Sequence, residues 1–126
     1  MPTLRRVLML TLILVTTGWV YAADAASYVY NYSDNRKILV VDGSYVKRYS
    51  DYRKLYVIDG SCIRRYSDYR KLACVSGDYV KRYSDSRKIA VLDGKYVKRY
   101  SDYRKVATSS SQMGQAAAAV YLLLDN

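Results

Sequence analysis

Short apolar and polar runs recur along this chain with a period of seventeen residues, from Ser27 to Ser111. An apolar run of the type KIAVLD is followed by Asp-Gly at 42–43, 59–60 and 93–94, or by the weaker Ser76-Gly77, and then by a second run of the type KYVKRYS. Asp-Gly between two such runs is a strong hairpin signal, since a type I′ turn needs positive φ at both central residues. The pattern therefore predicts two short antiparallel strands in every unit.

The units follow one another without a gap and occupy residues 27–43, 44–60, 61–77, 78–94 and 95–111. A unit of this size cannot bury its own apolar side, so it must stack or close against its neighbours. An open stack needs atypical polar ends, which these copies lack. We therefore expect an all-β fold of five hairpins closed around a central axis, with a β-solenoid or an open meander as the alternative.

The second reversal in each unit falls at a Ser-Asp-x-Arg segment, where the Asp side chain can bind backbone N–H groups. A two-residue Asp-Gly turn would place Val91 opposite Tyr96, and opposed residues share a face. One predicted face carries Tyr96, Lys98, Tyr100, Ile89 and Val91. The other carries Val97, Arg99, Lys88, Ala90 and Leu92.

Both ends of the chain depart from the repeat. Residues 1–22, with Arg5 and Arg6 before the apolar run 7–20, match a cleaved signal peptide, which predicts an exported protein, periplasmic or extracellular. Residues 23–126 then form a single domain. At the other end, residues 112–126 contain the apolar segment 116–124, which suits a helix or a buried closing strand and should dock on or in the repeat body.

Composition excludes several kinds of chemistry. The chain has no His and no Glu, and its eleven acidic residues are all Asp. This removes the usual imidazole base, the commonest metal ligand and glutamate acid/base pairs. Asp and Tyr recur with the repeat, as folding residues do. We therefore expect no enzyme, no metal and no cofactor.

The charge is strongly positive and gathers toward the Ser-Asp ends of the units. Without Arg5 and Arg6, nineteen Lys and Arg face eleven Asp, a net formal charge of +8 if Asp24 is retained. Such a field attracts anionic lipid, lipopolysaccharide or acidic glycan, while the export signal argues against intracellular nucleic acid. The candidate anion-binding residues form a basic rim of Arg48, Arg65, Arg82, Arg99, Lys54, Lys71, Lys88 and Lys105.

Two other interpretations of the basic residues are open, solubility alone and a structural or protein-interaction role. Lys and Arg on short strands also keep sheet edges soluble, and tyrosines suit half-buried strands. The repeats would then form a structural or protein-interaction module of the cell envelope with no polyanion ligand. Binding that persists in high salt would favour that module.

Cys62 and Cys74 lie in the third unit and share a predicted face on either side of the reversal. In an exported protein this spacing makes them candidates for a cross-strand disulfide, with small apolar fillers as the alternative. Two thiols without His make an incomplete metal site.

The seventeen-residue unit, the Asp-Gly turn followed by Tyr-Val and Arg, the Ser- and Asp-rich reversal and the apolar terminus resemble the five-fold β-flower proteins. These are small exported bacterial proteins. The resemblance covers Ser27 to the C-terminus and implies hairpins arranged as petals around an axis, with no established reaction. The chain differs from that family in having Arg36, Arg53, Arg70, Arg87 and Arg104 where the pattern favours Gly.

Overall fold

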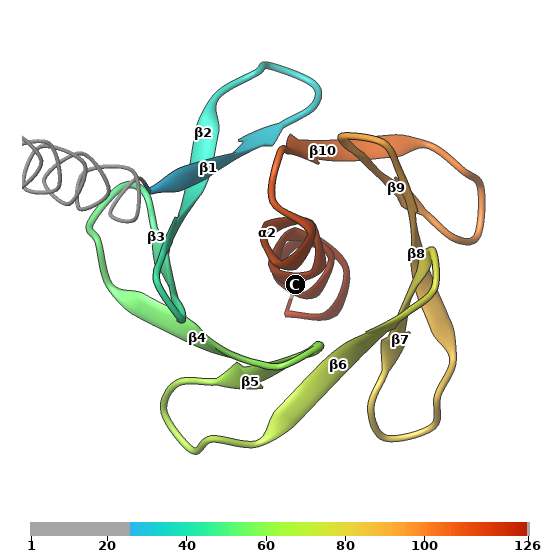
Figure 1. Ribbon diagram of the computed structural model, residues 1–126. Coiled ribbons are helices and arrows are strands. Elements are labelled where there is room, and N and C mark those ends of the chain that lie inside the picture. Colours follow the sequence, from blue (N-terminus) through green and yellow to red (C-terminus); the bar gives the residue numbers. More distant parts are fainter. Residues whose placement is uncertain (1–25, 126) are drawn as a thin grey trace, which may run out of the picture.

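The computed structural model describes residues 26–125, and the predicted signal segment, 1–22, lies outside them. Ten strands form a closed antiparallel barrel in which β1 pairs with β10, so the ring of five hairpins has no free edge (Figure 1). The strands are β1 (Ser27–Asn31), β2 (Lys37–Asp42), β3 (Tyr45–Arg48), β4 (Lys54–Asp59), β5 (Cys62–Arg65), β6 (Lys71–Ser76), β7 (Tyr79–Arg82), β8 (Lys88–Asp93), β9 (Tyr96–Arg99) and β10 (Lys105–Ser109). The predicted closed all-β fold is confirmed, and the open meander and the solenoid are excluded.

The turn after each apolar run is centred one residue later than predicted. Asp93 pairs with Tyr96, so the two-residue loop is Gly94-Lys95. Only Gly94 has a positive φ, +60°, which fits a type II′ turn with Gly first, and the predicted type I′ turn is wrong. Val91 consequently lies opposite Lys98 rather than Tyr96. The register moves by two residues, and a shift of two leaves every side chain on its original face.

A β-bulge in every unit changes the predicted faces near the second reversal. Between the pairs Val80–Ala90 and Lys81–Lys88, Ile89 is an extra residue without a partner. Lys88 is thereby moved to the outside of the barrel, where its Nζ lies 4.0 Å from the centroid of the Tyr79 ring, while Ile89 packs against the core. The predicted faces of Lys88 and Ile89 are therefore wrong, because a bulge inverts the alternation beyond it.

The second reversal is a tight loop built the same way in each unit. In the second unit the Asp51 Oδ1 accepts a hydrogen bond from the Arg53 backbone N–H at 3.2 Å, as the sequence predicted for this Asp. The residue between them, Tyr52, has a φ of +60°. The equivalent positive-φ residues are Asn35, Tyr69, Ser86 and Tyr103. The loop thus requires a residue with left-handed backbone angles, and none of the five copies has Gly at that position.

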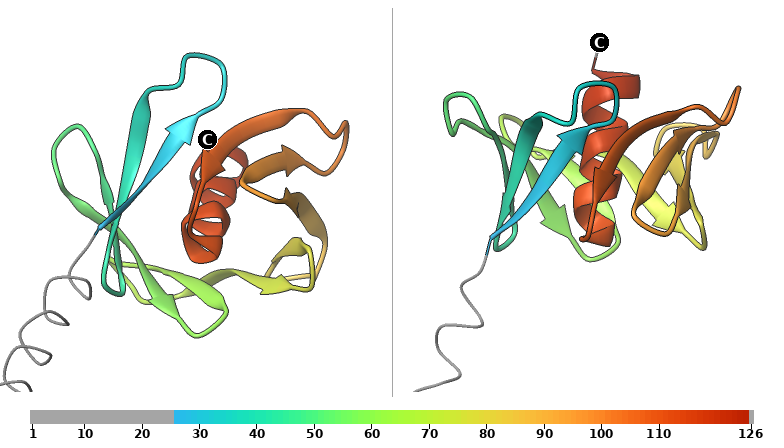
Figure 2. Two further views of the ribbon diagram at one scale, coloured as in Figure 1. Left: turned by 45° about the horizontal axis from the view of Figure 1, so that its top comes forward. Right: turned by 90° about the horizontal axis from the view of Figure 1, so that it is seen from above.

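The C-terminal segment runs through the middle of the barrel (Figures 1 and 2). It forms the helix α2 (Gln112–Ala119), which continues into the π-helix η1 (Val120–Leu124). The prediction that residues 116–124 dock on the repeat body is confirmed, and the open choice between helix and strand is decided in favour of helix. Helix α2 begins before the apolar run, and Ser111 caps it by accepting a hydrogen bond from the Gly114 N–H.

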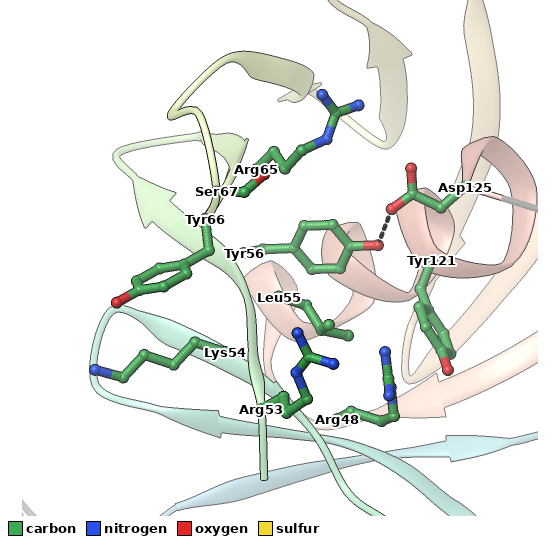
Figure 3. A pocket seen from close by; sticks show the side chains of 10 residues that line it. All are labelled: Arg48, Arg53, Lys54, Leu55, Tyr56, Arg65, Tyr66, Ser67, Tyr121 and Asp125. Atoms are coloured by element: carbon green, nitrogen blue, oxygen red, sulfur yellow. Dashed lines mark hydrogen bonds between the residues drawn. The ribbon is translucent and has the colours of Figure 1, made fainter. Parts of the chain in front are cut away.

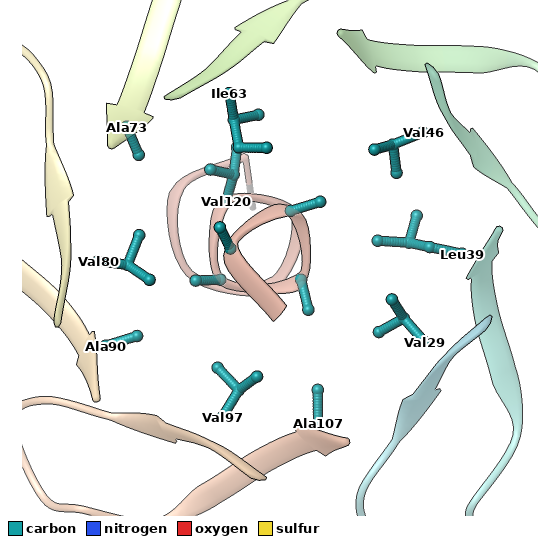
Figure 4. Close-up of a cluster of buried hydrophobic side chains, with 14 of the residues drawn as sticks. Val29, Leu39, Val46, Ile63, Ala73, Val80, Ala90, Val97, Ala107 and Val120 are labelled. Carbon is teal, nitrogen blue, oxygen red and sulfur yellow. The ribbon is translucent and has the colours of Figure 1, made fainter. Parts of the chain in front are cut away.

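Small side chains make this arrangement possible. Ala116 to Ala119 and Val120 have no exposed surface, and the inward-facing side chains of the strands surround them (Figure 4). An α-helix with ordinary side chains is about 10–12 Å across, so a run of Ala narrows it to fit a small barrel. The inward residues that form the wall of the core include Val29, Leu39, Val46, Ile63, Ala73, Val80, Ala90, Val97 and Ala107.

Polar contacts fix the N-terminal end of α2 at the Asp-Gly end of the barrel. The Gln115 Nε2 donates to the carbonyls of Gly94, at 2.7 Å, and Ser109, at 2.9 Å. The buried Ser109 hydroxyl donates to the Tyr28 carbonyl. The opposite end of the helical segment, η1, therefore emerges among the Ser-Asp loops.

Candidate functional site

Four arginines of the predicted basic rim lie on the inner face at the end where η1 emerges. Arg48 is opposite Leu39 and Arg65 is opposite Tyr56, so each shares the inward face of its partner. Arg82 and Arg99 occupy the same position opposite Ala73 and Ala90. We call this end of the barrel the mouth, defined by Arg48, Arg65, Arg82 and Arg99 with Asn31 at the fifth position.

Each of these arginines also has an acidic neighbour in its own loop. The N–O distances are 3.0 Å for Arg48–Asp51, 3.0 Å for Arg65–Asp68, 3.7 Å for Arg82–Asp85 and 3.3 Å for Arg99–Asp102. The backbone N–H of Arg70, with help from Arg65, lowers the pKa of the Asp68 carboxyl below its ordinary value. Solvent-accessible pairs of this kind contribute little free energy, so the arginines remain available to another anion.

The lysines of the predicted rim place their ammonium groups against tyrosine rings, although Lys54 and Lys105 also line pockets that rim arginines share. The Lys54 Nζ lies 4.1 Å from the centroid of the Tyr45 ring, and the Lys105 Nζ lies 4.0 Å from that of Tyr96, both on the outer wall. Lys88 is placed the same way, and Lys71 lies over Tyr83 at 5.4 Å. The bulges therefore divide the eight predicted residues into an inner set of arginines and an outer set of lysines that stack on tyrosines.

A pocket of about 760 Å³ opens between η1 and the strands β3 to β5, and we call it the first pocket (Figure 3). Three guanidinium groups line it, those of Arg48, Arg53 and Arg65, together with Lys54. Its one acidic lining residue is Asp125. Positive charge thus exceeds negative charge in this pocket, and the concave wall offers several N–H donors to one bound anion.

Tyr56 marks this pocket as different from the rest of the mouth. The equivalent inward positions carry Leu39, Ala73, Ala90 and Ala107. The Tyr56 side chain is 2% exposed, and its hydroxyl donates a short hydrogen bond to the Asp125 carboxylate. Burial, followed by that carboxylate, raises the pKa of the Tyr56 phenol above its ordinary value.

Sequence reasoning did not single out Tyr56, although its departure from the repeat is visible in the alignment of the units. Asp125 could not be linked to it, because the sequence predicts only that the tail docks on or in the repeat body and not which strands it meets. Arg53 likewise lies outside the predicted anion-binding set, because its position marks the second turn of the unit.

The π-helix has two unlike sides, and these break the five-fold symmetry of the mouth. Tyr121 and Asp125 face the first pocket, on the side of β3 to β5. Leu122 and Leu123 line a smaller pocket of about 250 Å³ with Asn31 and Val106. Arg99 and Lys105 also line this smaller pocket. One side of the mouth therefore sets Tyr121 and Asp125 against three arginines, and the other sets leucine against one arginine.

Cys62 and Cys74 oppose one another across β5 and β6, on the outer wall, and form a disulfide. They replace the Tyr and Val that the other units mostly carry at these positions. The bridge lies away from the first pocket and takes no part in lining it.

Within residues 26–125, no three His, Cys, Asp or Glu side chains are grouped so as to hold a metal ion. The same stretch contains no helix that is both long enough and apolar enough to cross a bilayer. No family model, curated protein or solved structure matches this chain. Any assignment of function therefore depends on the geometry of the mouth.

Proposed function

We propose that this chain is a non-enzymatic exported protein that binds an anionic component of the cell envelope in the first pocket. The ligand's phosphate or carboxylate would lie between Arg48, Arg53 and Arg65. The observation that carries the proposal is the convergence of these three guanidinium groups on a pocket with one carboxylate. The ring of hairpins around one axis also supports membership of the five-fold β-flower proteins.

The wall of the pocket suits a ligand with an apolar part. Leu55, the extra residue of its bulge, lines the pocket below the arginines and packs against the core. An anionic lipid or a lipopolysaccharide phosphate has this combination of charged and apolar groups, which favours both over an acidic glycan. We take these amphiphiles as the first probes.

The test compares two double variants, each of which removes one pair of charges. The double variant Arg48→Ser/Arg65→Ser removes two charges from the first pocket. Arg82→Ser/Arg99→Ser removes two charges from the same unit positions outside it. Cosedimentation with vesicles containing phosphatidylglycerol, and separately with lipopolysaccharide, should fall at least about tenfold for the first pair and little for the second. Circular dichroism melting would verify that both variants are folded.

The outcomes separate the alternatives. Equal losses in both pairs would mean that net charge alone drives association. Absence of binding by the unaltered protein at low salt would overturn the proposal. Binding to the pocket should weaken steeply as salt is raised, because exposed charges are screened beyond about 8 Å at physiological ionic strength.

A second function, a structural or interaction module, is favoured by one observation. Arg82 lines none of the pockets described above, yet it has the same Asp partner in its loop as the other arginines. The ion pairs of the mouth would then only order the loops, and a protein partner bound in high salt would be the expected finding.

A further inference from the structure

A second pocket, of about 710 Å³, lies beside the first and shares two lining residues with it, Arg48 and Tyr121. It opens between η1 and the strands β2 and β3. We call it the second pocket. Its position means that a molecule lying in the first pocket can extend past Arg48 into the second.

The two pockets are copies of one subsite, displaced by one repeat. The second pocket is lined by Arg36, Lys37, Ile38, Arg48, Tyr49 and Ser50. Adding seventeen to each number gives residues 53, 54, 55, 65, 66 and 67, and all six line the first pocket. Chemically equivalent groups are therefore presented twice, side by side, along the same wall.

Each subsite has an arginine that is free of carboxylates. Within residues 26–125, no ion pair involves the guanidinium of Arg36 or of Arg53. Asp34, the acidic residue of the second pocket, uses its Oδ1 to accept hydrogen bonds from the Arg36 backbone N–H and the Asn31 side chain. One uncompensated positive charge is thus available in each pocket.

The side chains of η1 restrict the two adjacent subsites to one side of the mouth. Tyr121 lines both pockets. The pocket of Asn31 and Val106, which the repeat places next along the ring, keeps Arg99 and Lys105 in its lining. Asn31 stands where the second pocket has Arg48, and Arg104, the equivalent of Arg36, does not line it. Leu122 and Leu123 take the place of Tyr121. The tail therefore selects two adjacent subsites out of a repeating wall.

We propose that the first and second pockets form one bipartite site for a ligand with two phosphate groups on one scaffold. One phosphate lies between Arg53 and Arg65, the other beside Arg36, and Arg48 stands between them. Ile38 and Leu55 contact the scaffold. This inference rests on the proposed function and narrows its ligand class to bisphosphorylated molecules. Linking two contacts makes the second intramolecular, which raises affinity without any new interaction.

The test uses a series of alkane-α,ω-bisphosphonates of increasing spacer length, each matched to an alkyl monophosphonate and titrated into the purified protein by calorimetry. At the best spacer, the bisphosphonate should bind about a hundredfold more tightly than its monophosphonate. Arg36→Ser should abolish this advantage and reduce monophosphonate affinity by no more than about twofold, the statistical loss of one of two subsites. Arg70→Ser, the same change one repeat beyond the first pocket, should alter neither affinity.

The test distinguishes failure of the bipartite site from failure of the proposed function. A bisphosphonate that never exceeds its monophosphonate, or an equal effect of Arg36→Ser and Arg70→Ser, overturns the bipartite site. Monophosphonate binding that is lost in Arg48→Ser would still uphold the proposed function. If neither compound binds, both proposals fail. Arg36→Gln, which keeps a long polar side chain, serves as a second variant should Arg36→Ser fold poorly.

A final arm identifies the source of the phosphates. Vesicles that contain a bisphosphorylated glycolipid are compared with the free bisphosphonate as competitor. Vesicle binding that the competitor displaces assigns the site to a lipid headgroup. Binding of the free compound without vesicle binding assigns it to a soluble bisphosphorylated molecule.

Discussion

The hydroxyl of Tyr56 donates a hydrogen bond to the carboxylate of Asp125 and so joins the wall of the barrel to the residue that follows its central helix. This bond crosses 69 residues of sequence. It also places a carboxylate of the protein itself in the basic first pocket, and the first two predictions concern its two ends.

The Tyr56 phenol should resist ionisation in the folded protein. Burial and the Asp125 carboxylate favour its neutral form, so its pKa is raised in the folded state but not in the unfolded chain. The contribution to stability is complete below the ordinary tyrosine pKa of about 10, and it is lost as pH rises above that value. Tyr56→Phe should therefore reduce the alkaline destabilisation.

Ultraviolet titration of phenolate gives the measurement. The native protein and Tyr56→Phe should show the same number of tyrosines that ionise before unfolding. They should differ by one after unfolding in denaturant. An equal difference in both states would show that Tyr56 titrates normally in the fold.

Removal of the Asp125 charge should strengthen anion binding. Asp125 is the one carboxylate that lines the first pocket, and it repels an incoming anion. Asp125→Asn keeps an acceptor for Tyr56 and should raise affinity for monophosphonate by roughly threefold to tenfold, as expected for loss of one nearby like charge. Asp102→Asn, beside Arg99, removes a charge outside the pocket and should change affinity little. A lower affinity in Asp125→Asn would contradict the predicted electrostatic effect.

A left-handed loop residue offers a stabilising substitution. Ser86 has a φ of +60°, which costs a residue with a side chain about 1–2 kcal/mol, whereas Gly loses about 0.5–1 kcal/mol in chain entropy. Ser86→Gly should therefore raise the free energy of unfolding by roughly 0.5 kcal/mol, measured in urea. Ser84→Gly, two residues earlier without positive φ, should lower it, and the opposite order would refute the strain argument.

Gly114 lies where the first turn of α2 meets the barrel. A Cβ at this position would lie 2.9 Å from the Ser109 Oγ and 3.2 Å from the Val41 Cγ2. Ser109 is buried and held by its bonds to Tyr28 and Ser111, so it cannot move away cheaply. Gly114→Ala should destabilise the protein by about 1–3 kcal/mol, despite the better helix propensity of Ala. Gln112→Ala, exposed in the same turn, should show no loss in a thermal melt.

Much of the wall could be predicted from the sequence, because period and turn residues are local signals. The exact turn register could not be predicted from the sequence. Asp-Gly can form the two-residue loop itself, or Asp can end the strand while Gly begins the loop. The bulge at Ile89 was also hidden. Its apolar side chain fits either face of a strand, and only closure of the ring around α2 decides which face it takes.

The site was less predictable than the fold. Arg48 and Arg65 follow from the repeat, but the repeat offers equivalent arginines in four of its five units. The tail selects one side of the mouth through Tyr121 and Asp125. The depth at which the tail docks depends on packing between segments that are far apart in the sequence. Periodic residues could therefore be ranked as candidates, while the particular pocket required the three-dimensional arrangement.

The inward position that holds Leu39 and Tyr56 on one side of the barrel holds Ala73, Ala90 and Ala107 on the other. A single helix cannot present the same surface to five copies of one hairpin. Once a helix fills the barrel, hairpins of similar sequence are no longer interchangeable. Exchanging the second and fourth hairpins would put a tyrosine against the helix where it has room only for a methyl group, and would leave a void in the wall opposite. The inward position of Leu39 and Tyr56 therefore ties each hairpin to one place around the helix.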